Sequence, residues 1–177
     1  MAFDVTIMVT DLRGFTNYAE KQEPAAVFNF LNQFQGLLAT IVEHHDGWVS
    51  TFMGDGMLAV FGAPKVLDNH ADHAVQAAQK ILAEVKQLSP LPIGIGLHSG
   101  SIVAGCLGTD GHLEFSVIGD TVNVASRLES LTKEVDSSLL ISKATQQRLK
   151  SLSLQSLGKL PIRGRDEHIE VFVLPPG

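Results

Sequence analysis

The chain has 177 residues, a net charge of −6 and a sequence pI of about 5.6. This length is enough for one domain with its own core, and 45% apolar with 18% charged residues is ordinary for a folded globular protein. The acidic balance argues against a general nucleic-acid binder, which needs a basic face. It still allows a nucleotide site in which phosphate charge is offset locally.

A single cysteine, Cys106, excludes a disulfide framework within the chain and favours a reducing compartment, so we predict a cytoplasmic location. We expect Cys106 to be a small buried residue in a strand. No signal peptide is visible from Met1 to Asp4, and no apolar run approaches the roughly 18 residues that span a membrane. The direct start in a strand-like segment favours a cytoplasmic catalytic domain of a larger regulated protein.

The hydrophobic pattern predicts mixed helices and strands. In chain order the predicted elements are a strand at 5–10, a helix at 24–41, strands at 49–53 and 57–61, a helix at 71–85, strands at 93–98, 102–107 and around Phe115, a helix that carries Asn123 and Arg127, a strand at 139–141, a helix at 144–149 and strands at 157–162 and 169–174. We also expect a turn at Gly100-Ser101 and a flexible loop over 108–111. This mixture predicts an α+β fold in which helices pack on one largely antiparallel sheet.

Two carboxylates are predicted to meet at one edge of this sheet. Asp11 ends the first strand, and Asp55 lies at the tip of a hairpin between two glycines that allow other atoms to approach closely. If the two strands are neighbours, both side chains suit Mg²⁺, which prefers oxygen ligands and shares itself with substrate phosphates. Backbone amides in the turn after Asp11, together with the Thr16 hydroxyl, favour phosphate. Taken singly, an Asp-Gly pair such as that at Asp55 more often marks a plain turn, and an aspartate after a strand, such as Asp11, more often caps a helix.

The run from Glu114 to Leu128 predicts a strand, a glycine turn and a helix. Asn123 and Arg127 are four residues apart and therefore share one face of that helix. Apolar residues at the same spacing can anchor a neighbouring face in the core: Val124, Leu128 and Leu131. A fixed amide beside a fixed guanidinium suits a substrate with sugar oxygens and phosphate charge.

The histidines do not form a convincing metal site in the sequence. His70 and His73 have a spacing that permits metal binding, but no third ligand is evident. We therefore interpret them as surface residues at a helix N-terminus. His98, in a Gly-Leu-His-Ser-Gly segment, is interpreted as structural.

Together these segments resemble the catalytic domain of the class III nucleotide cyclases, the adenylate and guanylate cyclases. The matching runs are Val9 to Thr16, Phe52 to Gly62, Gly96 to Gly100 and Ile118 to Arg127. Their order and spacing agree, and the resemblance covers nearly the whole chain as a single catalytic domain, 1–177. It implies a ferredoxin-like α+β fold and a head-to-tail homodimer with an active site at each interface.

The resemblance also implies an activity and a set of roles. A nucleoside triphosphate would be converted to its 3′,5′-cyclic monophosphate and pyrophosphate, in intracellular signalling. One protomer would hold two Mg²⁺ or Mn²⁺ ions through Asp11, Asp55 and the backbone of Leu12. The other would supply Asn123, which orients the ribose, and Arg127, which stabilises charge on the α-phosphate.

The same resemblance assigns the terminal phosphates to backbone groups of Gly14, Phe15 and Thr16. Similar domains add a lysine near the C-terminus, and Arg163 stands at that place in this chain. We expect Arg163 to substitute for the lysine. The alternative is a solvated arginine on a hairpin.

The positions that select the base depart from the family pattern. Adenylate cyclases usually have a lysine and an Asp or Thr there, and guanylate cyclases a Glu and a small residue such as Cys, whereas this chain has Thr51 and Ser116. A hydroxyl both donates and accepts, and Thr51 is short enough that water would have to bridge it to the base. We expect ATP as the substrate with weak base selectivity, and GTP or a pyrimidine triphosphate remains open.

Two other functions are compatible with parts of this pattern. A cyclase-like regulatory or dimerisation module would bind nucleotide without turnover, which the complete set of catalytic residues disfavours and Thr51 leaves open. A diguanylate cyclase has a related fold, but the sequence contains no Gly-Gly-Asp-Glu-Phe segment. We expect no nucleic-acid partner and no membrane segment in this chain.

Overall fold

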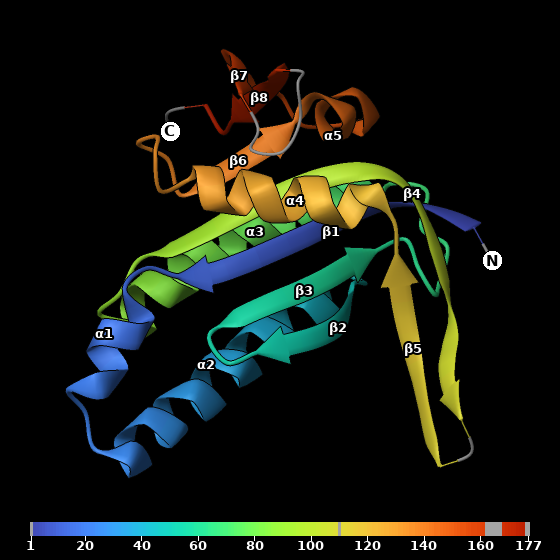
Figure 1. The fold of residues 1–177 in the computed structure, drawn as a ribbon. Coiled ribbons are helices and arrows are strands. Elements are labelled where there is room, and N and C mark those ends of the chain that lie inside the picture. The colour runs from blue at the N-terminus through green and yellow to red at the C-terminus, as the bar shows by residue number, and fades with distance from the viewer. Residues whose placement is uncertain (1, 110, 162–167, 176–177) are drawn as a thin grey trace.

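The computed structural model describes residues 2–109, 111–161 and 168–175, shown in Figure 1. The elements in chain order are β1 (Ala2–Leu12), α1 (Phe15–Glu20), α2 (Pro24–His44), β2 (Trp48–Met53), β3 (Gly56–Phe61), α3 (His70–Leu88), β4 (Ile93–Thr109), β5 (His112–Ile118), α4 (Asp120–Leu131), β6 (Leu139–Ser142), α5 (Lys143–Arg148), β7 (Gln155–Pro161) and β8 (His168–Val173). The predicted alternation of helices and strands is confirmed. Within these residues, eight strands form one sheet in the order β2-β3-β1-β4-β6-β8-β7, with β5 paired to β4 outside this path.

The sheet is largely antiparallel, which confirms the predicted α+β class. Among the described pairings, only β4 with β6 runs parallel. Such a parallel pair needs a crossover connection, and α4 provides part of it. The hairpin of β2 and β3 lies next to β1, so the ends of β1 and of this hairpin share one region of the sheet.

Helices cover both faces of the sheet (Figure 1). Met8 of β1 belongs to the core cluster formed with α2 and α3, whereas Val9 belongs to the cluster that includes Ala125 of α4. Because successive side chains in a strand point to opposite faces, Asp11 projects on the same face as Val9. The first predicted metal ligand therefore lies on the side of the sheet that α4 covers.

Glycines in β4 let α4 lie directly on the sheet. A Cβ atom at Gly96 would be 2.5 Å from the backbone oxygen of Ala125 and 2.5 Å from the backbone nitrogen of Glu129. A Cβ atom at Gly100 would be 2.7 Å from Oγ1 of Thr121. No side chain fits in these gaps, so Gly96 and Gly100 allow α4 to pack close to the sheet and set the distance between them.

The predicted turn at Gly100-Ser101 is wrong. β4 runs without a break from Ile93 to Thr109, and Gly100 pairs with Val5 in the ladder to β1. Glycine at this position makes room for the helix above it and does not reverse the chain.

The flexible loop predicted over 108–111 is also wrong in part. β4 continues to Thr109, which pairs with His112 at the start of β5, and residue 110 lies outside the described residues. The two strands form an arm that projects from the body of the domain (Figure 1). Cys106 lies on this arm and is exposed, contrary to the prediction that it is buried, because little of the domain covers the strand there.

His70 is buried, so its interpretation as a surface residue is wrong. Its Nδ1 lies 2.8 Å from Oγ1 of Thr6, and its Nε2 lies 3.0 Å from Oδ2 of Asp4. Burial lowers the pKa of His70, and the hydrogen bond to Asp4 opposes this effect. The side chain ties the start of α3 to β1. His98, interpreted as structural, lies 2.7 Å through its Nδ1 from Oγ of Ser142.

From the sequence we predict no apolar segment of membrane-spanning length, and α2 is an exception to this prediction. By length and composition alone, this helix is apolar enough to cross a membrane, with a mean hydropathy of 1.3 in its most apolar stretch. One helix of this kind is weak evidence, because a core helix of a folded domain passes the same test. Its buried residues, Phe34, Leu38, Ile41 and Val42, pack in the core with α3 and the sheet.

The close contact at Gly96 gives a stability prediction. We expect Gly96→Ala to lower the free energy of unfolding by about 1–3 kcal/mol, because the added methyl group must push the α4 backbone away from β4. Urea unfolding followed by circular dichroism measures this change. The matched control is Gly105→Ala in the same strand, where a Cβ would meet no atom within 4 Å. Equal stability of the two variants would show that α4 does not depend on the glycine contact.

Candidate active site

The structure brings Asp11 and Asp55 together, as predicted. Thr10 of β1 pairs with Met57 of β3, which places the end of β1 beside the tip of the β2–β3 hairpin. Oδ2 of Asp55 accepts a hydrogen bond of 3.2 Å from the backbone amide of Leu12. The side chain of Asp55 also lies close enough to Asp11 to raise the pKa of that carboxyl group. Two carboxyl groups from different elements thus converge at one edge of the sheet.

Electrostatics make this pair unfavourable without a cation. Burial, followed by the hydrogen bond to Asp55 and its negative charge, raises the pKa of Asp11 from 3.8 to about 7. The carboxylate of Glu129 adds to the increase, and the guanidinium of Arg13 opposes it. In the absence of further positive charge, Asp11 therefore keeps its proton to a higher pH than an isolated aspartate does.

The donor set fits a divalent cation that also binds phosphate. The ligand atoms that Asp11, Asp55 and the backbone of Leu12 offer are oxygens, which Mg²⁺ and Mn²⁺ prefer. No group of three or more His, Cys, Asp or Glu side chains converges on a metal position in the described part of the chain. Mg²⁺ in nucleotide sites is typically held by one or two carboxylates, with substrate phosphates and water as the remaining ligands. The two carboxyl groups of Asp11 and Asp55 have the chemistry that such a site needs, and their role as metal ligands stays a prediction.

The segment after Asp11 has the form predicted for a phosphate-binding turn. Gly14 has φ of +71°, a left-handed conformation that favours glycine, and it directly precedes α1. The amides in the first turn of a helix have no partners within the helix. The backbone amides of Phe15 and Thr16 occupy this position at the start of α1, shortly after Asp11 in the chain. Their role toward terminal phosphates stays a prediction.

Asn123 and Arg127 lie on α4 as predicted. Asn123 is exposed and Arg127 is half-buried, and their spacing of four residues places them on one face of the helix. The predicted anchors are all buried, in a cluster with β6 and β8: Val124, Leu128 and Leu131. The helix thus presents an amide and a guanidinium from a firmly packed base.

Within one chain, the two halves of the predicted site face different directions. Glu129 is buried on the sheet side of α4, and its charge acts on Asp11. Arg127 lies two residues away, which corresponds to about 160° around an α-helix. Asn123 shares the face of Arg127. The carboxylates therefore lie at the sheet side of α4, whereas the polar pair lies on its far side.

The predicted base-selecting residues lie on two elements that touch. Thr51 is exposed in β2, where its Oγ1 donates a hydrogen bond of 3.3 Å to the backbone oxygen of Phe52. Ser116 is half-buried in β5, opposite Gly105 of β4. β2 and β5 are in contact within the chain. Arg163, the predicted phosphate ligand near the C-terminus, lies outside the described residues.

Sequence reasoning missed the pair of Arg13 and Glu129. The guanidinium of Arg13 reaches across the end of β4 to the last turn of α4, where its Nη2 donates to Oε2 of Glu129 at 2.5 Å. The sequence carries only a partial signal, because Arg13 follows Asp11 by two residues but lies in the turn after β1, where strand alternation no longer sets the direction of its side chain. Nothing in the sequence indicates which residue on the helix receives the arginine.

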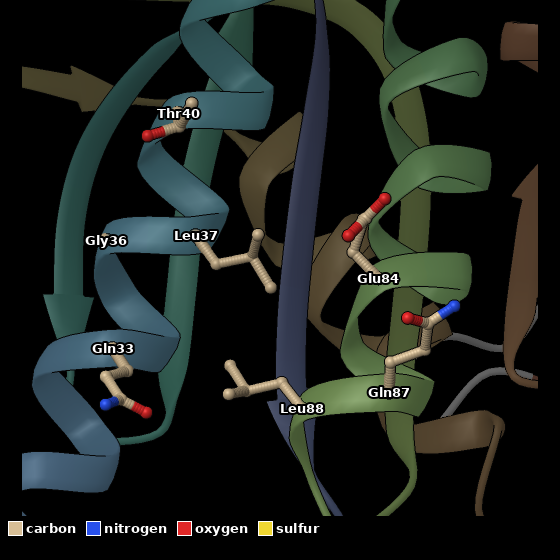
Figure 2. A pocket seen from close by; sticks show the side chains of 7 residues that line it. All are labelled: Gln33, Gly36, Leu37, Thr40, Glu84, Gln87 and Leu88. Atoms are coloured by element: carbon tan, nitrogen blue, oxygen red, sulfur yellow. The ribbon is translucent and has the colours of Figure 1, made fainter.

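A groove elsewhere in the fold is a poor nucleotide site. It lies between α2 and α3, on the face of the sheet away from α4, and has a volume of about 540 Å³. Figure 2 shows Leu37 and Leu88 pointing toward one another across it. Among the described residues that line it, Glu84 carries the only charge, so nothing there offsets triphosphate charge.

Known proteins match this chain over its full fold. The family model of the adenylate and guanylate cyclase catalytic domain matches residues 2–175. The chain belongs to this family. An adenylate cyclase of Anabaena cylindrica is 32% identical over 185 residues, which cover 95% of this chain and 36% of that protein. The chain therefore spans little more than a third of that relative's length.

Solved structures of cyclases share the fold. The crystal structure of the adenylyl cyclase CyaB from P. aeruginosa has a TM-score of 0.91 at 26% identity and covers 100% of this chain and 96% of that one. The guanylate cyclase domain of RhGC from Catenaria anguillulae, solved in complex with GTP, has a TM-score of 0.86 at 29% identity, with 97% and 96% covered. These neighbours confirm the expected class III cyclase fold.

The raised pKa of Asp11 predicts how stability depends on pH. The folded chain keeps a proton on Asp11 that the unfolded chain loses above pH 3.8, so this group's contribution to stability falls as pH rises from about 4 to about 7. Asp11→Asn removes this loss. We expect the variant to melt a few degrees above the parent at pH 8, with a smaller difference at pH 5, in metal-free protein by thermal denaturation.

Added Mn²⁺ completes this test. At pH 8 it should raise the melting temperature of the parent more than that of Asp11→Asn, because the amide gives the cation no charge to bind. An Asp11→Asn variant that is less stable than the metal-free parent at pH 8 would contradict the electrostatic account of the pair.

Proposed function

We propose that this domain is a metal-dependent cyclase that converts a nucleoside triphosphate, ATP by preference, to its 3′,5′-cyclic monophosphate and pyrophosphate, for intracellular signalling. The observation that carries the proposal is the convergence of Asp11 and Asp55 beside the turn at Gly14, on a fold that also presents Asn123 and Arg127. Because ATP is an intracellular substrate, we place the reaction in the cytoplasm.

Asp11, Asp55 and the backbone of Leu12 would hold two Mg²⁺ or Mn²⁺ ions. When bound, these ions neutralise triphosphate charge and lower the pKa of the ribose 3′-hydroxyl. The fit rests on the oxygen ligands that these residues offer, and on the negative charge of Asp55, which raises the pKa of Asp11.

The remaining residues would position the substrate for an internal displacement. The ribose 3′-oxygen attacks the α-phosphorus, the bond from that phosphorus to the bridging oxygen breaks, and pyrophosphate leaves. Asn123 orients the ribose through its amide. Arg127 donates to the α-phosphate oxygens as their charge grows, a role for which a planar and permanently charged group is suited. Backbone amides of Gly14, Phe15 and Thr16 hold the terminal phosphates.

The site would be completed by a second copy of the chain in a head-to-tail homodimer. The carboxylates and the pair of Asn123 and Arg127 lie on different sides of α4, so one chain cannot bring all four to one substrate. The arm of β4 and β5 supports the same arrangement, because it projects from the domain (Figure 1) with three large apolar side chains exposed. These side chains are Val103, Leu107 and Ile118.

Thr51 and Ser116 would read the base only loosely. Each offers one hydroxyl, which can donate or accept, and the exposure of Thr51 allows water to mediate its contact. A site built on directed, buried hydrogen bonds can discriminate by roughly 10⁴-fold, and two adaptable hydroxyls should give far less.

A comparison of all four triphosphates tests the activity and its selectivity. With Mn²⁺ present, we expect pyrophosphate release from ATP, and a kcat/KM for GTP that is lower by less than about 100-fold. Coupled pyrophosphate detection and chromatography of the cyclic products give both values. Absence of turnover with every triphosphate would overturn the proposed function, whereas strict selectivity for ATP would overturn only the account of Thr51 and Ser116.

Complementation tests the shared site. We expect Asp55→Ala and Arg127→Ala each to lower kcat by at least about 100-fold in the homodimer, and their mixture to regain activity at one composite site per dimer. Differently tagged chains and tandem purification isolate the mixed dimer. A purified mixed dimer that stays inactive would contradict a site built from two chains.

A further inference from the structure

A largely buried ion pair joins the turn after β1 to the last turn of α4. Nη2 of Arg13 donates to Oε2 of Glu129 at 2.5 Å and to the backbone oxygen of Glu129 at 2.8 Å, and it also contacts Oγ1 of Thr132. The two charged side chains are 18% and 7% exposed. We name this set of three residues the α4 clamp.

The fold makes room for the α4 clamp at Gly94. Any Cβ atom at this position would collide with the guanidinium of Arg13, which lies over the glycine on its way to the helix. The backbone amide of Arg13 is also fixed, by a hydrogen bond of 2.8 Å to the backbone oxygen of Pro92. Both ends of the arginine are therefore held, and its length sets the distance between β1 and the last turn of α4.

A gain in the free energy of folding does not explain well why the chain has a buried pair of Arg13 and Glu129. Taking two charges out of water costs about as much as their attraction returns, and well-packed apolar residues often serve stability as well or better. Nη1 of Arg13 is also buried without a hydrogen-bond partner among the described residues. What the pair supplies is a defined geometry, because one nitrogen of a planar guanidinium meets the carboxylate and the backbone oxygen of Glu129 and the hydroxyl of Thr132.

That placement matters because of what each end carries. Arg13 lies two residues after Asp11, which belongs to the carboxylate half of one site. Glu129 lies two residues after Arg127, on a helix whose far side presents Asn123 and Arg127. In the dimer of the proposed function, on which this inference rests, that face serves the other site.

We propose that Arg13 and Glu129 are positioning residues that act on the active site completed by the partner's carboxylates, although Arg13 lies beside the carboxylates of its own chain. The α4 clamp fixes the position of α4 along its own helix axis. It thereby places Asn123 and Arg127 against the substrate held by the other subunit. An error of about 1 Å in such a group can lower the rate by about 100-fold.

The mixed dimer separates the two sites. In it, the chain with Asp55→Ala donates α4 to the single working site, and the chain with Arg127→Ala donates the carboxylates. We add the pair Arg13→Met and Glu129→Met to one chain or to the other. Replacing both charges by apolar groups of similar length avoids leaving one of them buried alone, so we expect melting temperatures within about 4 °C of the parent.

The result expected is asymmetric. With the double substitution on the α4-donating chain, kcat should fall at least ten times further than with the same substitution on the carboxylate-donating chain. KM for ATP should change by less than about three-fold, because Arg127 interacts most strongly with the charge that develops in the transition state. Arg13→Lys on the α4-donating chain should rescue only part of the loss, since lysine keeps the charge but lacks the planar, pre-organised guanidinium.

A matched control removes another arginine–carboxylate pair. Arg148 of α5 holds Asp4 of β1, with Nη2 of the arginine 2.8 Å from Oδ1 of the aspartate. Arg148→Met should affect kcat equally on either chain, because α5 carries no proposed catalytic residue.

The outcomes separate the inference from the proposed function. An inactive parent mixed dimer would overturn the shared site itself. An active parent with equal losses from the two placements, or with the larger loss on the carboxylate-donating chain, would overturn the positioning role of the α4 clamp alone. A large change in KM with kcat unaltered would also overturn it, because it would assign Arg13 and Glu129 to substrate binding.

Discussion

The close approach of α4 to β4 is the constraint on which the rest of the site depends. Because Gly96 has no side chain, the backbone of α4 at Ala125 and Glu129 lies directly on the strand. This contact fixes the height of the helix, while the buried row that includes Leu128 fixes its rotation. Asn123 and Arg127 then face away from the sheet as a consequence of packing, and no hydrogen bond or ion pair among the described residues holds either side chain there. The α4 clamp adds control along the helix axis, which neither packing surface supplies.

Favourable packing orients α4, whereas the carboxylate pair of Asp11 and Asp55 is unfavourable for the stability of the fold. Asp11 and Asp55 are brought together by the pairing of β1 with β3 and by the hairpin tip, and their mutual repulsion helps to raise the pKa of Asp11 to about 7. The fold therefore holds an unfavourable arrangement that a cation would relieve. Polar groups placed against their own electrostatic preference are typical of functional sites, and here the cost falls on the residues that the metal would bind.

Much of this site could be predicted from the sequence, because its signals are local. Alternation predicts β1, the two glycines around Asp55 mark the hairpin, and a spacing of four places Asn123 with Arg127. The hairpin turns at Gly54-Asp55, one residue earlier than an Asp-Gly turn would, because Gly56 already pairs with Met53. The errors arose where tertiary contacts override local preference. Gly100 suggested a turn, whereas it belongs to a continuous strand and makes room for Thr121 of α4.

Other errors have the same origin. His70 looked like a surface residue at a helix start, but its partners Thr6 and Asp4 are more than sixty positions away in the chain. The pairing of Arg13 with Glu129 spans 116 positions, and no local pattern specifies it. The apolar length of α2 was underestimated from the sequence, and its buried residues pack in the core.

The central claim is that each active site is built from two chains. A crystal structure of the dimer with Mn²⁺ and an ATP analogue whose α,β-bridging oxygen is replaced by a methylene group tests it most directly. The account predicts that one subunit's Asp11 and Asp55 bind the metal and triphosphate, while the other subunit's Asn123 and Arg127 contact the ribose and α-phosphate. An analogue bound to all four residues of a single chain, or bound in the groove between α2 and α3, would contradict it.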